Sequence, residues 1–110
     1  MNKKQERSNT CIRLYVNNSY RLDYNSIRIN IHNDILHEIG KLKKAYELIK
    51  DGKRILTEVI FKNGTRGDIL VPEDFRVIEI LHSESEKEVL EKIKSYPEGL
   101  EVIYFSTEEI

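Results

Sequence analysis

Apolar and polar positions alternate along several short stretches of the chain, which is the pattern of half-buried β-strands. The first two stretches are residues 11–16 and 27–31, and the polar residues between them make a β-hairpin the expected arrangement. The same pattern predicts four further strands, at residues 55–62, 68–71, 75–81 and 100–105. The turn signals Asn63-Gly64 and Pro72-Glu73-Asp74 separate the first three of these.

The period changes to that of an α-helix after Asp34. Apolar residues then recur at spacings of four and three, and they predict a stripe that faces the core, made of Ile35, Ile39, Leu42, Tyr46 and Ile49. Asn33 or Asp34 is expected to cap this helix and Gly52 to end it. On the helical wheel His37 then points away from the core, together with Lys41 and Lys44.

A second helix is predicted after residue 83. Ser83 and Glu86 have the spacing of a capping box, and the helix stripe is formed by Val89, Leu90, Ile93 and Tyr96. After the hairpin, the elements follow the order α-β-β-β-α-β, which predicts an α+β fold. At 110 residues the chain has the length of one domain. We expect residues 1–10 to be a flexible basic arm and residues 11–110 to form a single domain.

Charge is distributed unevenly. Residues 1–67 contain fourteen Lys and Arg against seven Asp and Glu, whereas residues 68–110 contain four against twelve. A basic segment suits a polyanion and an acidic one a divalent cation, although interspersed Lys and Glu are equally typical of solvated helices. No apolar run reaches the roughly 20 residues of a membrane span, and the lone Cys11 has no disulfide partner. The expected location is therefore cytoplasmic, with no membrane contact.

Candidate chemistry is concentrated in carboxylates at one end of the predicted sheet. Asp68 begins one strand and Glu79 lies in the next, eleven positions later across a short hairpin, so the two side chains are expected to meet. Hard cations such as Mg²⁺ or Mn²⁺ prefer oxygen ligands of this kind. Glu79 interrupts an apolar strand, where a carboxylate is costly unless it has a partner. Glu58, on the preceding strand, and Glu38, at the edge of the helix stripe, are further candidates.

With these residues the chain resembles the PD-(D/E)xK nuclease superfamily, which is restriction-endonuclease-like, and in particular its small archaeal-type and competence-associated branch. The likeness spans residues 34–105 and is carried by Glu58, by GTRGDILV around Asp68, by VIEIL around Glu79 and by the later EKIKSYP. It implies an αβββαβ core, here with an N-terminal β-hairpin. It also implies that Asp68 and Glu79 bind the metal, that Glu38 is the first-helix acid and that His37 is the helical histidine.

One residue departs from the family pattern. A Lys is expected two places after the Glu, on the same face of the strand, and this position is occupied by Leu81. Lys62, Arg66 and Lys41 are candidates for a relocated cation, and Lys62 shares a predicted strand face with Glu58. Loss of the cation altogether would leave a nuclease fold that binds without cutting.

The leading interpretation is a metal-dependent endonuclease that hydrolyses DNA and acts as a homodimer. The catalytic set is Asp68, Glu79, Glu58, Glu38 and Lys62, and phosphate contacts are expected from Lys3, Lys4, Arg7, Arg13, Arg28, Lys41, Lys43, Lys44 and Arg66. One alternative is a catalytically silent module with the same fold that binds nucleic acid or a partner protein. Another is a ferredoxin-like βαββαβ binding domain whose first strand is 27–31. His32 and His82 are interpreted as structural.

Overall fold

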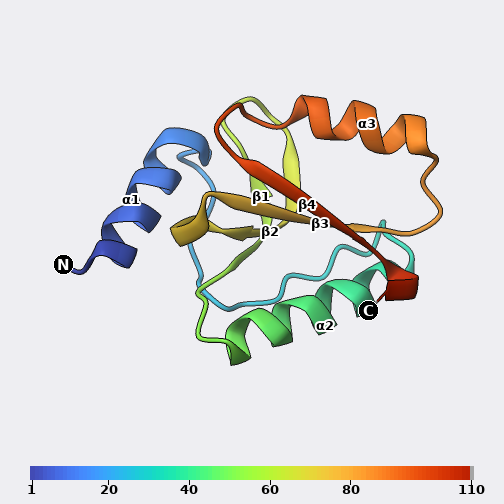
Figure 1. The fold of residues 1–110 in the computed structure, drawn as a ribbon, viewed down its shortest axis with the longest axis horizontal. Coiled ribbons are helices and arrows are strands. Elements are labelled where there is room, and N and C mark those ends of the chain that lie inside the picture. The colour runs from blue at the N-terminus through green and yellow to red at the C-terminus, as the bar shows by residue number, and fades with distance from the viewer. Residues whose placement is uncertain (110) are drawn as a thin grey trace.

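The computed structural model describes residues 1–109 and shows an α+β fold (Figure 1). The helices are α1 (Lys3–Tyr15), α2 (Ile35–Lys50) and α3 (Glu86–Ser95). The strands are β1 (Leu56–Ile60), β2 (Arg66–Val71), β3 (Arg76–Leu81) and β4 (Glu101–Ser106). Two 3-10 turns complete the elements, η1 (Pro72–Asp74) and η2 (Thr107–Glu109). All four strands predicted after the first helix are confirmed, within two residues at each end.

The sheet is mixed, and its strands lie side by side in chain order, β1-β2-β3-β4. The pairs β1–β2 and β2–β3 are antiparallel, because short turns join them, whereas β3 and β4 are parallel. A parallel pair requires a crossover connection. Helix α3 provides it, so that the chain from α2 to β4 follows the predicted order of elements.

Helices cover both faces of the sheet (Figure 1). Ala45 of α2 packs with Ile69, Ile78 and Ile80 on one face. On the other face, Cys11 of α1 and Tyr96 at the end of α3 belong to a cluster built on Leu70 and Val77. Successive side chains of a strand point to opposite faces. The two clusters therefore use alternate positions of β2 and β3, and their apolar packing holds the three layers together.

The N-terminal part of the chain differs from the predictions, because neither the flexible arm nor the β-hairpin forms. Residues 3–15 are helix α1, which begins with a capping box between Asn2 and Gln5 and buries Ser8 and Cys11. The helix lies against η1, where Arg7 Nε donates a hydrogen bond of 3.0 Å to the Glu73 carbonyl. The alternation in residues 11–16 is compatible with a strand as well as with a helix. Packing of this segment against η1 and the sheet selects the helix.

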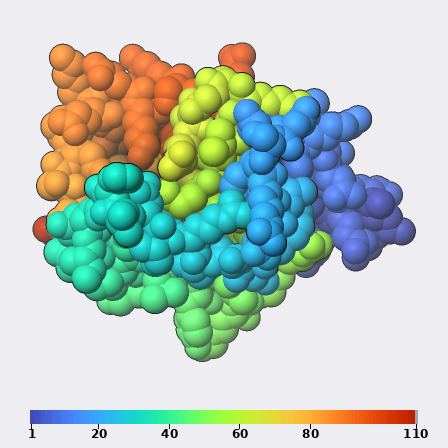
Figure 2. Space-filling view, turned by 180° about the vertical axis from the view of Figure 1, so that it is seen from behind, coloured from blue at the N-terminus to red at the C-terminus, as the bar shows by residue number. Residues whose placement is uncertain are grey.

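Residues 27–31, predicted as a strand, carry no regular secondary structure in the described chain. Their segment runs beside β1 and is tied to it by Thr57, whose hydroxyl accepts from the Arg28 N–H (2.9 Å) and donates to the Ser26 carbonyl (2.8 Å). Figure 2 shows this segment, in blue to cyan, crossing the molecule between α1 and the start of α2. Side-chain hydrogen bonds thus replace the strand ladder that the alternation predicted.

Helix α2 is correctly predicted, but the face that it turns inward is not. Asp34 is its cap, with its side chain accepting from the Leu36 N–H. Most of the predicted core stripe is exposed to solvent, whereas His37, Glu38 and Lys41 are buried against the sheet. Acidic groups on the sheet compensate the buried cations His37 and Lys41, and these two cations in turn compensate Glu38. Helix α3 also begins two residues later than predicted, with Ser85 as its cap in place of Ser83.

Candidate functional site

Asp68 and Glu79 form the centre of a buried cluster of charged side chains. The registered pairs of β2 and β3 run as far as Ile69–Ile78, and the next position on each strand is one of the two acids. At this point each of the two carboxylates accepts a hydrogen bond from a backbone N–H of the other strand. Glu79 Oε1 accepts from Asp68 N (3.1 Å), and Asp68 Oδ2 accepts from Ile80 N (2.8 Å). The predicted proximity of the two carboxylates is therefore confirmed.

Figure 1 shows that α2 lies on the opposite side of the sheet from α3, and the first two turns of α2 deliver His37 to this pair. Its Nε2 lies 3.2 Å from Asp68 Oδ2, and its Nδ1 lies 2.8 Å from Glu38 Oε2. Burial alone would lower the pKa of His37, but the carboxylates of Asp68 and Glu38 outweigh it and raise the pKa to about 9. The ring is then an imidazolium at neutral pH and donates one hydrogen bond to each carboxylate. His37 thus faces the core, contrary to the wheel prediction.

Glu38 and Lys41 extend the cluster along α2. Lys41 is completely buried, and its Nζ donates to Glu38 Oε1 (2.7 Å) and to the Arg28 carbonyl (2.7 Å). Glu38 also accepts from the Asn30 N–H at 2.7 Å. Burial favours the neutral acid, but the Asn30 N–H and the two neighbouring cations lower the pKa of Glu38 to about 2. Glu38 is therefore ionised at neutral pH, and the Lys41 side chain that it contacts is shielded from solvent.

Glu58 has an unusual backbone in the middle of β1. Its φ of 48° lies in the left-handed region, which an L-residue within a strand adopts only where the surroundings enforce it. Glu58 Oε2 lies 3.4 Å from Lys41 Nζ, and Oε1 is buried without a hydrogen-bond partner. The Nη1 atom of Arg66 lies 3.9 Å from that oxygen. Strain and an unsatisfied oxygen at one residue are typical of a functional position.

Lys92 completes the cluster from α3, and sequence reasoning missed it. Its Nζ lies 2.6 Å from Glu79 Oε2, and the Tyr96 hydroxyl contacts the other oxygen of the same carboxylate. Burial and the charge of Asp68 raise the pKa of Glu79 to about 7 in spite of Lys92. Lys92 stands three residues after Val89 and four before Tyr96, both on the predicted inward stripe. That spacing was the signal that could have located it.

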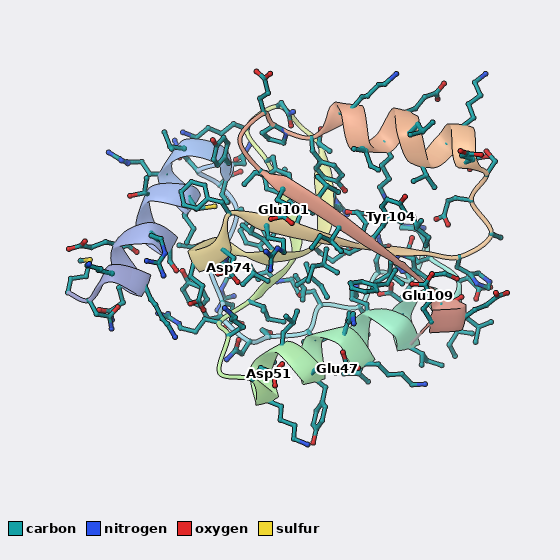
Figure 3. All side chains as sticks on the ribbon, in the orientation of Figure 1. Glu47, Asp51, Asp74, Glu101, Tyr104 and Glu109 are labelled. Carbon is teal, nitrogen blue, oxygen red and sulfur yellow. The ribbon has the colours of Figure 1, made fainter. Side chains whose placement is uncertain are left out.

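Leu81, at the position where the nuclease resemblance leads us to expect a lysine, is half-buried at the end of β3. Lys92 thus brings an ammonium group to Glu79 from a different element. Tyr104 of β4, labelled in Figure 3, is the registered partner of Glu79 and remains half exposed. Paired residues of neighbouring strands share a face of the sheet. An accessible aromatic ring therefore lies next to the cluster on the side of α3.

Other predicted residues lie away from the cluster. Lys62 does not share a face with Glu58, because it lies outside β1 and its Nζ donates to the Arg13 carbonyl (2.6 Å). The predicted phosphate contacts fall in separate places. Lys4 and Arg7 lie at η1, and Lys3, Lys43 and Arg13 are exposed on their helices. Arg28 stacks on Tyr20, and Lys44 on Phe105. These cations lie on several separate elements, and Lys41 is buried.

The cluster as a whole is nearly neutral, because acids and cations are paired. Four carboxylates, those of Glu38, Glu58, Asp68 and Glu79, meet the three cations His37, Lys41 and Lys92. Within residues 1–109, no group of three or more His, Cys, Asp or Glu side chains is arranged to hold a metal ion. Asp68 and Glu79 are thus a two-carboxylate site at most. Hard cations are often held in this way, with water and substrate oxygens as the other ligands.

Comparison with known proteins leaves the family of the chain open. No family model, curated protein or solved structure matches it. Nor does any helix of residues 1–109 have the length and apolar character needed to cross a membrane.

Proposed function

We propose that the protein is a metal-dependent phosphodiesterase acting on DNA, built on the αβββαβ core of restriction-endonuclease-like nucleases. The order α2-β1-β2-β3-α3-β4 and the mixed sheet support this assignment. The observation that carries it is the approach of Lys92 to the buried pair Asp68 and Glu79. A phosphodiesterase of this type needs two carboxylates and a cation at one point, and here the chain brings them together from β2, β3 and α3.

Asp68 and Glu79 would hold one Mg²⁺ or Mn²⁺. The chemistry of the donor set supports the fit, because two buried carboxylates on adjacent strands offer the oxygen ligands that these ions prefer. Glu79 Oε2 contacts the Lys92 ammonium at 2.6 Å, so an ion bound there would share or displace that contact. When bound, such an ion acidifies water and offsets phosphate charge. His37 orients Asp68 by donating to its Oδ2, and Glu38 orients His37 in turn. Lys92, partly exposed, places positive charge where a phosphate would approach the cluster.

DNA as the substrate is supported by the surroundings of this cluster. Arg66 is exposed at the start of β2, two residues before Asp68, and its charge suits a phosphate. Tyr104 offers an accessible ring beside Glu79, and such rings stack with unpaired bases. Phosphate contacts from the other predicted cations would be spread over α1 and α2.

A second candidate function is a silent module that binds nucleic acid or a protein. It is favoured by the near-neutral cluster, in which every carboxylate already has a cation of the protein as a neighbour. A metal ion would have to displace Lys92 from Glu79, which costs more than filling an open site. The two candidates therefore differ in whether Mn²⁺ binds and whether DNA is cut.

One pair of measurements separates the candidates. Mn²⁺ that binds only the folded protein should stabilise it by about 2.7 kcal/mol at 100 times its Kd. The double variant Asp68→Asn, Glu79→Gln should lose this effect, and the exposed pair Glu86→Gln, Glu88→Gln should keep it. Cleavage of a mixture of single-stranded, duplex and branched DNA should likewise be lost in the first variant and kept in the control. Mn²⁺ binding that survives the first variant would contradict the metal site, and Mn²⁺ binding without cleavage would favour the silent module.

A further inference from the structure

Helix α2 has two faces with opposite roles. His37, Glu38 and Lys41 point into the sheet, while Ile35, Ile39, Leu42 and Tyr46 form a stripe on the outer face. Ile29 and Ile31, from the segment that precedes the helix, are exposed as well, Ile31 to 86%. We call these six residues the α2 surface: Ile29, Ile31, Ile35, Ile39, Leu42 and Tyr46.

The α2 surface exposes a large apolar area. Its six residues together expose the equivalent of nearly four whole residues, which is on the order of 450 Å² of apolar area at about 120 Å² for each side chain. The largest apolar patch on a typical monomer is about 300–600 Å² and often has a function. One partner of a stable interface buries about 800 Å², of which somewhat more than half is apolar. The area of the α2 surface thus matches the apolar part of one half of a protein–protein interface.

The shape of the surface fits a copy of itself. Ile29, Ile31, Ile35, Ile39 and Leu42 line a groove of about 430 Å³ beside the first turns of α2. Tyr46, 65% exposed, lies one turn beyond the groove toward the helix C-terminus, where Figure 3 labels Glu47 and Asp51. A groove at one end and a large side chain at the other are complementary when two α2 helices pack antiparallel about a twofold axis.

The spacing of the stripe supports the same arrangement. Ile35, Ile39, Leu42 and Tyr46 are separated by four, three and four residues, which is the seam spacing of a coiled coil. In an antiparallel pair centred between Ile39 and Leu42, Leu42 packs on the partner's Ile39, and Tyr46 on the partner's Ile35.

We infer that the protein forms a homodimer through the α2 surface, with the two α2 helices antiparallel. This inference does not depend on the proposed function, because it rests on the exposed apolar residues and not on the charged cluster, of which Glu38 borders the groove. The dimer interface and the charged cluster are nevertheless connected, because the same helix, α2, packs at the interface and positions His37, Glu38 and Lys41.

Sedimentation equilibrium tests the dimer, with Leu42→Glu compared against Leu90→Glu. Leu42 and Leu90 are exposed to 51% and 52%, but Leu90 lies on α3, away from the α2 surface. Wild type and Leu90→Glu should have twice the monomer mass of 13.0 kDa at about 100 µM, and Leu42→Glu should be a monomer. Tyr46→Glu serves as a second monomer variant, and circular dichroism confirms that each variant is folded. A monomeric wild type overturns the inference and leaves the surface to a different partner.

Cysteine pairing tests the orientation of the two helices. An oxidised mixture of Ile35→Cys and Tyr46→Cys should yield mainly the mixed disulfide, because these positions face each other only in the antiparallel pair. Cys11 is buried and does not compete. Predominant disulfides between identical chains would indicate parallel helices and would overturn the antiparallel assignment.

Discussion

The ammonium group of Lys92 lies 2.6 Å from Oε2 of Glu79, although the two residues belong to α3 and β3. Glu79 is 2% exposed, whereas Lys92 is about one-third exposed. The pair therefore joins the buried carboxylates to the surface of the molecule. It brings a cation to Glu79 from α3, whereas residue 81, two places after Glu79 on β3, is a leucine.

Replacing Lys92 by Met should abolish most of the proposed DNA cleavage. A positioned charge of this kind contributes about 10²–10³-fold to the rate when it acts on the transition state. The measurement is the single-turnover cleavage rate with saturating Mn²⁺. The exposed Lys94→Met, on the same helix, is the control and should retain the wild-type rate. Equal rates for Lys92→Met and wild type would exclude Lys92 from the chemistry.

The Glu79→Gln variant should be more stable than wild type at pH 8.5, and this advantage should be much smaller at pH 5. Burial and Asp68 raise the pKa of Glu79 from 4.5 to about 7, so the folded state holds the proton more tightly than the unfolded chain. Stability from this group is complete below pH 4.5 and is lost as the pH rises through about 7. Gln removes that loss, a gain of up to about 3 kcal/mol in the free energy of unfolding.

Urea unfolding of wild type and variant at the two pH values measures this gain, and the exposed Glu91→Gln is the matched control. A Glu79→Gln protein that loses more stability at pH 8.5 than at pH 5 would show instead that Lys92 stabilises the ionised carboxylate.

His37→Gln should destabilise the fold most at pH 6. The carboxylates of Asp68 and Glu38 raise the pKa of His37 from 6.5 to about 9, against the effect of burial. The stability that His37 contributes is therefore complete below pH 6.5 and disappears as the pH rises through 9. The difference in unfolding free energy from wild type should fall from on the order of 3 kcal/mol at pH 6 toward zero near pH 10.

Exposed His32→Gln is the control for this experiment, and its free energy of unfolding should follow that of wild type at every pH. A constant deficit for His37→Gln across the range would mean that its ring contributes packing rather than charge.

Cys11 should resist alkylation in the native protein. The side chain is completely buried in the cluster between α1 and the sheet, and burial raises the pKa of its thiol from 9.0 to about 12. A shift of this size reduces the thiolate at pH 8 by roughly 10³-fold. Reaction with a thiol reagent should therefore be slow until urea unfolds the chain. Rapid labelling without urea would show that α1 leaves the sheet readily.

Much of the fold follows from local patterns. The strands from 55 to 81 and the last strand were predicted because alternation and turn residues act over a few positions. The meeting of Asp68 with Glu79 was predictable as well, since a short hairpin brings residues on its two strands together. Residues 11–16 show the limit of local patterns, because their alternation is compatible with a helix and only packing against η1 and the sheet selects α1.

The sequence by itself determined the order of elements from α2 to β4 and the position of the two central acids, since both depend on periodicity and short loops. Only the tertiary structure decided which face of α2 is buried. Apolar burial would have turned Ile35 and Tyr46 inward, but the sheet presents Asp68 and Glu58 to this helix, and His37 and Lys41 pair with them. The approach of Lys92 to Glu79 was decided in the same way. A contact between α3 and β3 depends on how the crossover packs on the sheet, and no local pattern encodes that.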